Sequence, residues 1–157
     1  GMPRGCHKAD LFRFAALYAE GGVYLDVKTI PLRRVADVFP PDKLVMTRGH
    51  RSWSEGLHIG IVGAPPRHPA IGRILAFIEG SSMKALQRHY HHYCVAAQRV
   101  AGQRQAEHRD VQYLQEACSA GECAKTGGAD QYGLCCMVRH PALGDVFVSR
   151  DPTYPWP

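Results

Sequence analysis

Five polar side chains between residues 10 and 28 have the types and spacing of a ligand-binding site. Asp10 and Arg13 are three residues apart, which places them on one face of a helix. Tyr24, Asp26 and Lys28 alternate with apolar residues, so on a strand they would share one side. A carboxylate after an apolar run is costly unless it is paired, solvated or metal-bound. The pattern therefore predicts a site for a charged ligand, with plain Asp10–Arg13 and Asp26–Lys28 ion pairs as the alternative.

A helix, a sharp stop and a strand are needed to position these groups. Four apolar residues with helical spacing predict a helix over residues 8–20, with the Asp10–Arg13 pair in its first turn: Leu11, Phe14, Ala15 and Tyr18. Gly21-Gly22 can end this helix through a left-handed backbone conformation. The following residues 23–27 read as a short buried strand, closed off by Pro31. Helix N-termini and strand C-termini are where α/β proteins hold anionic ligands.

The rest of the chain alternates between helical and strand patterns, which predicts an α/β sandwich. Its 157 residues indicate a single domain, 1–157, in which residues 8–32 carry the candidate site and 118–157 form a Cys-rich segment. The further elements expected are a helical turn at 35–39, strands at 43–47 and 57–62, a helix at 69–79, a helix-rich stretch at 83–118, and strands at 134–138 and 146–149.

The amino-acid composition limits the kinds of partner that the chain is expected to bind. Lys and Arg number 19 against 14 Asp and Glu, and the net charge of +5 suits a phosphate-bearing ligand. The basic residues form no dense run, so nucleic acid is not expected as a partner. There is no stretch of 18 apolar residues, and we expect no membrane span in this chain. The opening Gly1-Met2 resembles an expression remnant or a cut from a longer chain rather than a signal peptide.

Six cysteines are unevenly placed, and the last four fall close together: Cys118, Cys123, Cys135 and Cys136. An even cluster in a loop-rich tail predicts disulfides and an oxidising compartment. Neighbours on a strand point to opposite faces, so Cys135 and Cys136 should have different partners. Zinc is the alternative, with these thiols and residues 89–92 (His-Tyr-His-His) as ligand types, although paired Cys-x2-Cys knuckles are lacking.

Taken together, residues 9–28 resemble the signature of GT-A-type glycosyltransferases with the sugar-binding DXD motif. The chain reads Ala-Asp-Leu-Phe-Arg at 9–13 and Gly-Gly-Val-Tyr-Leu-Asp-Val-Lys at 21–28. The family includes initiating mannosyltransferases and, more distantly, glucosylating bacterial toxins. The resemblance implies that Asp10 and Arg13 contact the hydroxyls of the donor sugar and that Tyr24 lies near the nucleotide. It also implies that Asp26 is the catalytic first carboxylate of the DXD, and a ligand of Mn²⁺ or Mg²⁺.

Two departures from the family pattern have consequences. Lys28 replaces the second Asp of the DXD, and one carboxylate holds a hard divalent cation less firmly than two. We therefore hypothesise a weakened or absent metal dependence, in which Lys28 and Arg13 supply the counter-charge to a diphosphate. The family also has an N-terminal α/β portion that grips the base. Because the signature here starts at residue 8, we expect that portion to be missing from this chain.

The sequence thus predicts transfer of a hexose from a nucleotide-sugar donor to a glycan, lipid or protein hydroxyl, with a secretory compartment suspected. A non-catalytic nucleotide-sugar or glycan binding module and a Cys/His-stapled interaction domain are the alternatives. Glu55 and His58 could reach the acceptor side, although a loop carboxylate is usually just solvated. Trp53 and Trp156 could serve as stacking platforms for a sugar ring.

Overall fold

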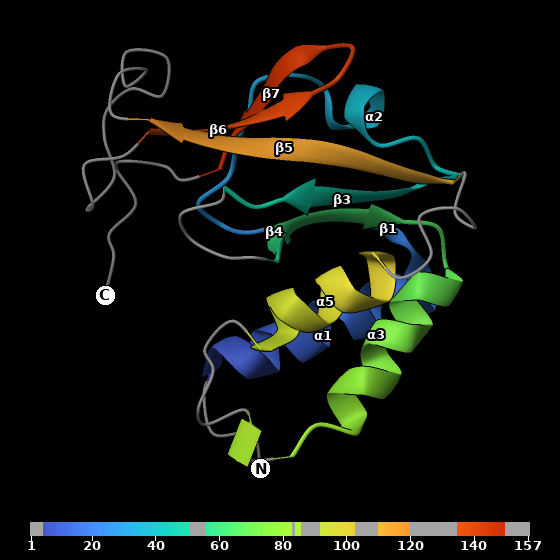
Figure 1. The fold of residues 1–157 in the computed structure, drawn as a ribbon. Helices are drawn as coiled ribbons and strands as arrows, with labels where there is room; N and C mark the ends of the chain where they lie inside the picture. Colours follow the sequence, from blue (N-terminus) through green and yellow to red (C-terminus); the bar gives the residue numbers. More distant parts are fainter. Residues whose placement is uncertain are drawn as a thin grey trace.

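The computed structural model describes residues 5–50, 56–82, 84–85, 92–102, 110–119 and 135–149 (Figure 1). Within them helices and strands alternate as in an α/β protein, so the predicted fold class is confirmed. The helices are α1 (Gly5–Glu20), α2 (Val35–Val38), α3 (Pro69–Glu79) and α5 (His92–Gly102). The strands are β1 (Gly22–Leu25), β2 (Ile30–Pro31), β3 (Leu44–Arg48), β4 (Leu57–Ala64), β5 (Val111–Ser119), β6 (Cys135–His140) and β7 (Gly144–Val148).

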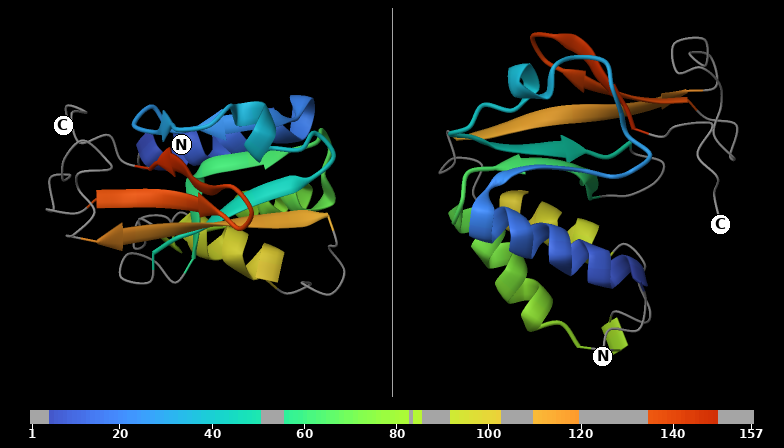
Figure 2. Two further views of the ribbon diagram at one scale, coloured as in Figure 1. Left: turned by 90° about the horizontal axis from the view of Figure 1, so that it is seen from above. Right: turned by 180° about the vertical axis from the view of Figure 1, so that it is seen from behind.

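One sheet organises these elements. Its seven described strands run in the order β1-β4-β3-β5-β6-β7-β2. The β3–β5 pair is parallel, and all the other described pairs are antiparallel. Helices α1, α3 and α5 lie together on one face, while the short α2 lies on the other side near β7 (Figures 1 and 2). The described β1 therefore lies at one edge of the sheet, directly above the helical layer.

A hydrophobic core lies on each face of the sheet. The helix-side core joins Phe14 of α1, Ile71 of α3 and Tyr93 of α5 to the sheet through Leu44 and Met46, all buried. On the opposite side a smaller core gathers buried residues around α2 and β7: Val38, Phe39, Val45, Ile61, Leu114, Val138, Val146 and Phe147. Burial of this apolar area on both faces holds the sheet between its two layers.

The stop between α1 and β1 is made by the two glycines. Gly21 and Gly22 have φ of 70° and 97°, which is the left-handed region that side chains disfavour. A Cβ on Gly21 would also lie 2.7 Å from Cδ of Pro66, so the chain passes too close for any side chain. The Gly21 amide donates to the carbonyl of Leu17 at 2.9 Å and closes the helix. The predicted Gly-Gly stop is thus confirmed.

The start of α3 is also determined by residues next to it in the sequence. His68 is its N-cap, and its Nδ1 accepts a hydrogen bond from the amide of Ala70 at 3.2 Å. Pro69 follows at the first helical position, where its missing N–H costs nothing. The Nε2 of His68 lies 3.0 Å from Oδ2 of Asp110, just before β5. The helix at 69–79 was predicted with these bounds.

Helix α1 differs from its prediction in two respects. It begins at Gly5, so Asp10 and Arg13 lie in its interior and not at its N-terminus. Its buried face also includes these two polar residues, whereas Ala15 and Tyr18 of the predicted apolar stripe are exposed. The expected stripe is confirmed for Phe14 and for Leu11, which packs against the core, and was wrong for Ala15 and Tyr18, because the helix also buries the Asp10–Arg13 pair.

Two strand predictions also need correction. The strand expected at 23–27 ends at Leu25, and Lys28 lies in a turn at residues 27–28. The stretch 83–118 was predicted to be helix-rich, which holds for α5, but its end is the nine-residue strand β5. Gln, Glu and Ala are good helix formers, and pairing with β3 and β6 overrides that preference in β5. Cys118 is consequently a strand residue and not the end of a helical stretch.

Candidate donor-sugar site

Arg13 is the centre of the first cluster of polar groups. Its side chain comes from α1 and is 5% exposed. Its Nη2 lies 3.0 Å from Oδ1 of Asp10 and 3.4 Å from Oδ1 of Asp26, and its Nη1 donates to the carbonyl of Ile59 at 2.5 Å. Its Cζ stands 4.4 Å from the ring centre of Tyr24, a cation–π contact. The structure thus brings together four of the five residues that the sequence singled out.

Burial changes the acid–base properties of this cluster. Asp10 is 9% exposed, and desolvation raises its pKa to about 6, against the lowering effect of Arg13. The pKa of Tyr24 is also raised, chiefly by burial, and the nearby carboxylate of Asp26 adds to the rise. Asp10 therefore changes charge near neutral pH, while Tyr24 stays protonated and can donate. Such groups suit the recognition of sugar hydroxyls, which both donate and accept hydrogen bonds.

Asp26 is fixed by its backbone on both sides. Its amide donates to the carbonyl of Gly60 in β4 at 2.8 Å, and its carbonyl accepts from the amide of Thr29 at 2.8 Å. Its carboxylate lies over Gly60, because a Cβ built there would meet Oδ2 of Asp26 at 2.5 Å and Nε2 of His58 at 2.8 Å. One oxygen of Asp26 thus faces Arg13, and the other shares the space above a glycine with an imidazole.

Lys28 does not extend this row as predicted. The alternation that would align it with Asp26 ends where β1 ends, at Leu25. Arg13 is already bound to two carboxylates and a carbonyl, so its charge is largely used inside the protein. The hypothesis that Arg13 offers counter-charge to a diphosphate loses support from this geometry. Counter-charge from Lys28 stays a hypothesis.

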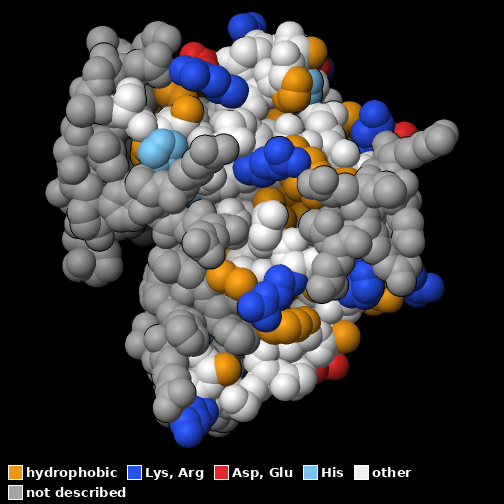
Figure 3. All heavy atoms as spheres, viewed as in Figure 1, with side chains coloured by type: hydrophobic (Ala, Val, Ile, Leu, Met, Phe, Trp, Pro, Cys, Tyr) orange, Lys and Arg blue, Asp and Glu red, His pale blue; other side chains and the backbone are white. Residues whose placement is uncertain are grey.

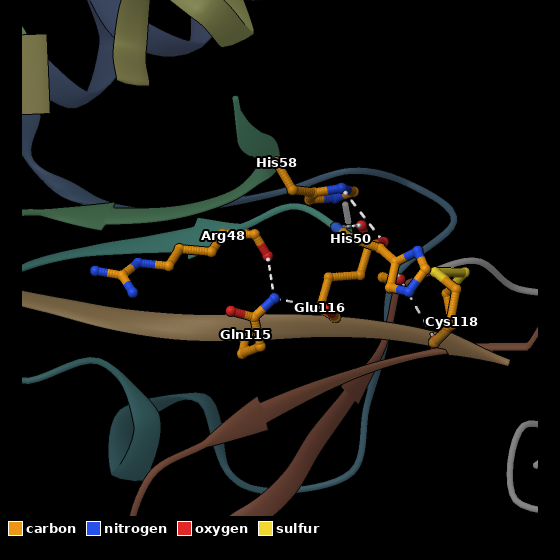
Figure 4. The surroundings of a disulfide bond; sticks show 8 residues. Arg48, His50, His58, Gln115, Glu116 and Cys118 are labelled. Carbon is orange, nitrogen blue, oxygen red and sulfur yellow. Dashed lines mark hydrogen bonds and ion pairs between the residues drawn. A yellow bond between two sulfur atoms is a disulfide. The ribbon is translucent and has the colours of Figure 1, made fainter. Parts of the chain in front are cut away.

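A second polar cluster surrounds Glu116 of β5, which is 2% exposed (Figure 4). Its Oε1 accepts a hydrogen bond from Oγ of Ser149 at 2.7 Å and lies 3.5 Å from Nδ1 of His58. Its Oε2 accepts from the backbone amide of His50 at 3.2 Å. Sequence reasoning considered His58 but missed Glu116. The available signal was its position two residues after Leu114 and two before Cys118, on the inward side of an alternating segment.

Next to Glu116, Cys118 and Cys136 form a disulfide between β5 and β6. A disulfide in the cysteine-rich segment was predicted and is confirmed. Sulfur atoms of this pair and an oxygen of Glu116 lie within 4.8 Å of one another, but the two sulfurs bonded together are not thiolate ligands. Other parts of the zinc interpretation lie outside the described side chains: His89, His91, His92, Cys123 and Cys135.

Some secondary candidates cannot be placed. Glu55, Trp53 and Trp156 lie outside the described residues.

On the face drawn in Figure 3, the described Lys and Arg side chains are scattered over several elements and do not gather into one patch. Of the helices that the structure describes, none has the length and apolar character that crossing a membrane requires.

Comparison with known proteins points to the same segment. Residues 1–46 match the family model described as "Glycosyltransferase sugar-binding region containing DXD motif". This stretch contains Asp10, Arg13, Tyr24 and Asp26, so the resemblance is confirmed where the first cluster lies.

Two curated relatives match over 66 residues. An initiation-specific alpha-1,6-mannosyltransferase of Candida albicans is 38% identical over 42% of this chain and 16% of its own length. The enzyme of the same name from Schizosaccharomyces pombe is 36% identical over 42% of this chain and 15% of its own length. The chain thus matches only a short part of these relatives. No solved structure matches the chain.

Proposed function

We propose that this chain carries the donor-sugar side of a glycosyltransferase site, which moves a hexose from a nucleotide-sugar to a hydroxyl acceptor. The observation that supports this most is the cluster of Asp10, Arg13, Tyr24 and Asp26 inside the segment that matches the family. Both curated relatives are mannosyltransferases, which favours a mannose donor and a secretory compartment. The acceptor would be a glycan, lipid or protein hydroxyl.

The residues have separable roles in this proposal. In the reaction the acceptor oxygen bonds to the anomeric carbon and releases its proton to solvent, while the nucleoside diphosphate leaves with the electron pair of the broken C–O bond. Asp10 and Tyr24 would orient sugar hydroxyls, and Arg13 would hold both carboxylates in place. Asp26 would face the reacting end of the donor. Fixed groups of this kind contribute to catalysis by positioning the bond that breaks.

In the first cluster, Asp26 and its neighbours are the groups that could bind a divalent metal. Oδ1 of Asp26 faces Arg13, whereas Oδ2 packs against Gly60 beside Nε2 of His58, so Oδ2 is the oxygen that would bind a metal. Bound there, Mn²⁺ or Mg²⁺ would neutralise charge on the donor diphosphate.

Thermal unfolding with UDP, GDP and CDP, each with Mn²⁺ or EDTA, tests the donor site. A ligand at about 100 times its Kd adds about 2.7 kcal/mol of stability. For a domain of this size that corresponds to roughly 5 to 10 °C in Tm. A shift with one nucleotide would support the proposal and indicate the donor class. No shift with any of the three would contradict a donor site in this chain.

A non-catalytic binding module is the second candidate, and the replacement of the second DXD carboxylate by Lys28 favours it. Asp26→Asn distinguishes the two, because its amide keeps the size of the side chain and removes the charge. An enzyme would lose release of sugar from the donor, whereas a binding module would show no turnover before or after the change.

A further inference from the structure

The DXD motif of this chain lacks its second carboxylate, and the structure places another metal-ligand type beside the first. His58 is the second residue of β4 and lies far from Asp26 in sequence, but the amide of Asp26 donates to the carbonyl of Gly60 in the same strand. Nε2 of His58 and Oδ2 of Asp26 lie 2.8 Å and 2.5 Å from one point, the position of a Cβ on Gly60. Two ligand types therefore come together against the backbone of residue 60, which is possible only because that residue is glycine.

The other side of the His58 ring has the partner expected of a metal-binding histidine. Its Nδ1 lies 3.5 Å from Oε1 of Glu116, a carboxylate that is 2% exposed. A carboxylate at Nδ1 favours the tautomer that carries its proton there, which leaves the lone pair on Nε2. Histidines that bind a metal through one ring nitrogen commonly donate the N–H of the other ring nitrogen to a carboxylate.

Glu116 is itself held in place. The hydroxyl of Ser149 donates to its Oε1 at 2.7 Å, and the backbone amide of His50 donates to its Oε2 at 3.2 Å. Figure 4 shows His58 directed toward Glu116, with the Cys118–Cys136 disulfide beside them. The line of groups thus runs from Ser149, just after β7, through Glu116 of β5 to His58 of β4 and ends at Gly60.

We propose that Asp26 and His58 together form the divalent-cation site of this chain, with Glu116 as the residue that orients His58. The proposal rests on the donor-site function above, and it names a ligand that the DXD pattern does not contain. Mn²⁺ accepts both carboxylate oxygen and imidazole nitrogen, and the remaining positions are left for water and donor phosphate oxygens. His58 thereby takes the place of the carboxylate that Lys28 has removed.

Electron paramagnetic resonance of Mn²⁺ added to the full chain tests this without any turnover. Titration gives the affinity, and electron spin-echo modulation reports an imidazole nitrogen bonded to the metal. We expect one bound Mn²⁺ with nitrogen modulation in the wild-type chain. His58→Ala should abolish the modulation and weaken binding at least about tenfold, and Glu116→Gln should weaken it by roughly 10- to 100-fold.

His140 supplies the matched control. It is the last residue of β6, and its Nδ1 accepts from the amides of Ala142 and Leu143 in the turn to β7. His140→Ala should leave affinity and modulation unchanged. Wild-type Mn²⁺ without nitrogen modulation would overturn the proposal, as would modulation that survives His58→Ala. The first of these results needs no variant, so a failure of His58→Ala to fold does not protect the idea.

Measurements with Mn²⁺ alone and with added GDP or UDP separate this proposal from the donor function. Nitrogen modulation without any nucleotide effect would support the Asp26–His58 site and contradict the donor function. A nucleotide-induced rise in Tm together with Mn²⁺ that shows no nitrogen modulation would support the donor function and refute the role of His58.

Discussion

A substitution at Gly60 should affect the candidate site without affecting the stability of the fold. We predict that Gly60→Ala folds with nearly unchanged stability and loses the site. The backbone of Gly60 is not left-handed, and alanine in a strand is favoured over glycine by roughly 0.5–1 kcal/mol. The new Cβ would meet Oδ2 of Asp26 at 2.5 Å and Nε2 of His58 at 2.8 Å, and both are ends of side chains that can rotate away.

Displacing these two atoms removes the groups that face the proposed cation. We therefore expect Mn²⁺ affinity to fall at least about tenfold, while Tm changes by no more than about 2 °C, the equivalent of roughly 0.5–1 kcal/mol for a domain of this size. Calorimetry of unfolding and Mn²⁺ titration of the same sample provide the two numbers.

Gly63→Ala is the matched control on the same strand. Its Cβ would collide with the ring of Phe39 in the core on the other side of the sheet, away from Asp26. Overpacking of this kind costs about 1–3 kcal/mol, or roughly 2–10 °C in Tm, with Mn²⁺ affinity kept in the folded protein. The reasoning is refuted if Gly60→Ala binds Mn²⁺ as the wild type does, or if it unfolds as readily as Gly63→Ala.

Three further predictions concern charge and covalent links. The pKa of Asp10 is raised to about 6 in the folded chain from 3.8, so the folded state binds more protons than the unfolded state between these values. Stability should fall as pH rises from about 4 to about 7, by at most about 3 kcal/mol, and urea unfolding of Asp10→Asn should lack this slope. Arg13→Ala leaves Asp10 and Asp26 without their shared cation and should cost about 3–5 kcal/mol at pH 8. It should cost less at pH 5, where Asp10 can take up a proton, and an equal loss at both pH values in denaturant titrations would contradict this role. The Cys118–Cys136 link closes a loop with a sequence separation of 18, so the double change Cys118→Ala, Cys136→Ala should lower stability by about 3 kcal/mol. Dithiothreitol should lower the Tm of the wild type and leave that of the double variant unchanged.

Local sequence signals predicted those parts of the molecule whose structure is determined locally. The Gly-Gly stop after α1 and the Pro69 start of α3 follow from backbone preferences that few other residues share. The proximity of Asp10 and Arg13 follows from helix geometry alone, and Tyr24 and Asp26 lie within a few residues of the same stop. This cluster of side chains could therefore be predicted without the structure.

The features that the sequence did not predict depend on pairing between strands that are far apart in the chain. Strand β5 has helix-forming residues, and only its position between β3 and β6 makes it a strand. Glu116 comes to His58 across 58 residues of chain through that pairing, and no local pattern encodes such a contact. Lys28 was placed wrongly for a related reason, because an alternating pattern does not show where a strand loses its partner.

The bond between Cys118 and Cys136 also acts on the alignment of the sheet. The two residues are directly opposed in the pairing of β5 with β6, and Glu116 is opposed to Val138 two residues along. A slip of one residue between β5 and β6 would turn the side chains of one strand to the other face relative to its partner. Ser149, whose amide donates to the carbonyl of Cys136, would then no longer lie beside Glu116. A covalent link between opposed residues forbids that slip. Oxidation of this pair therefore fixes the register of β5 with β6 and keeps the hydroxyl of Ser149 on the carboxylate that faces His58.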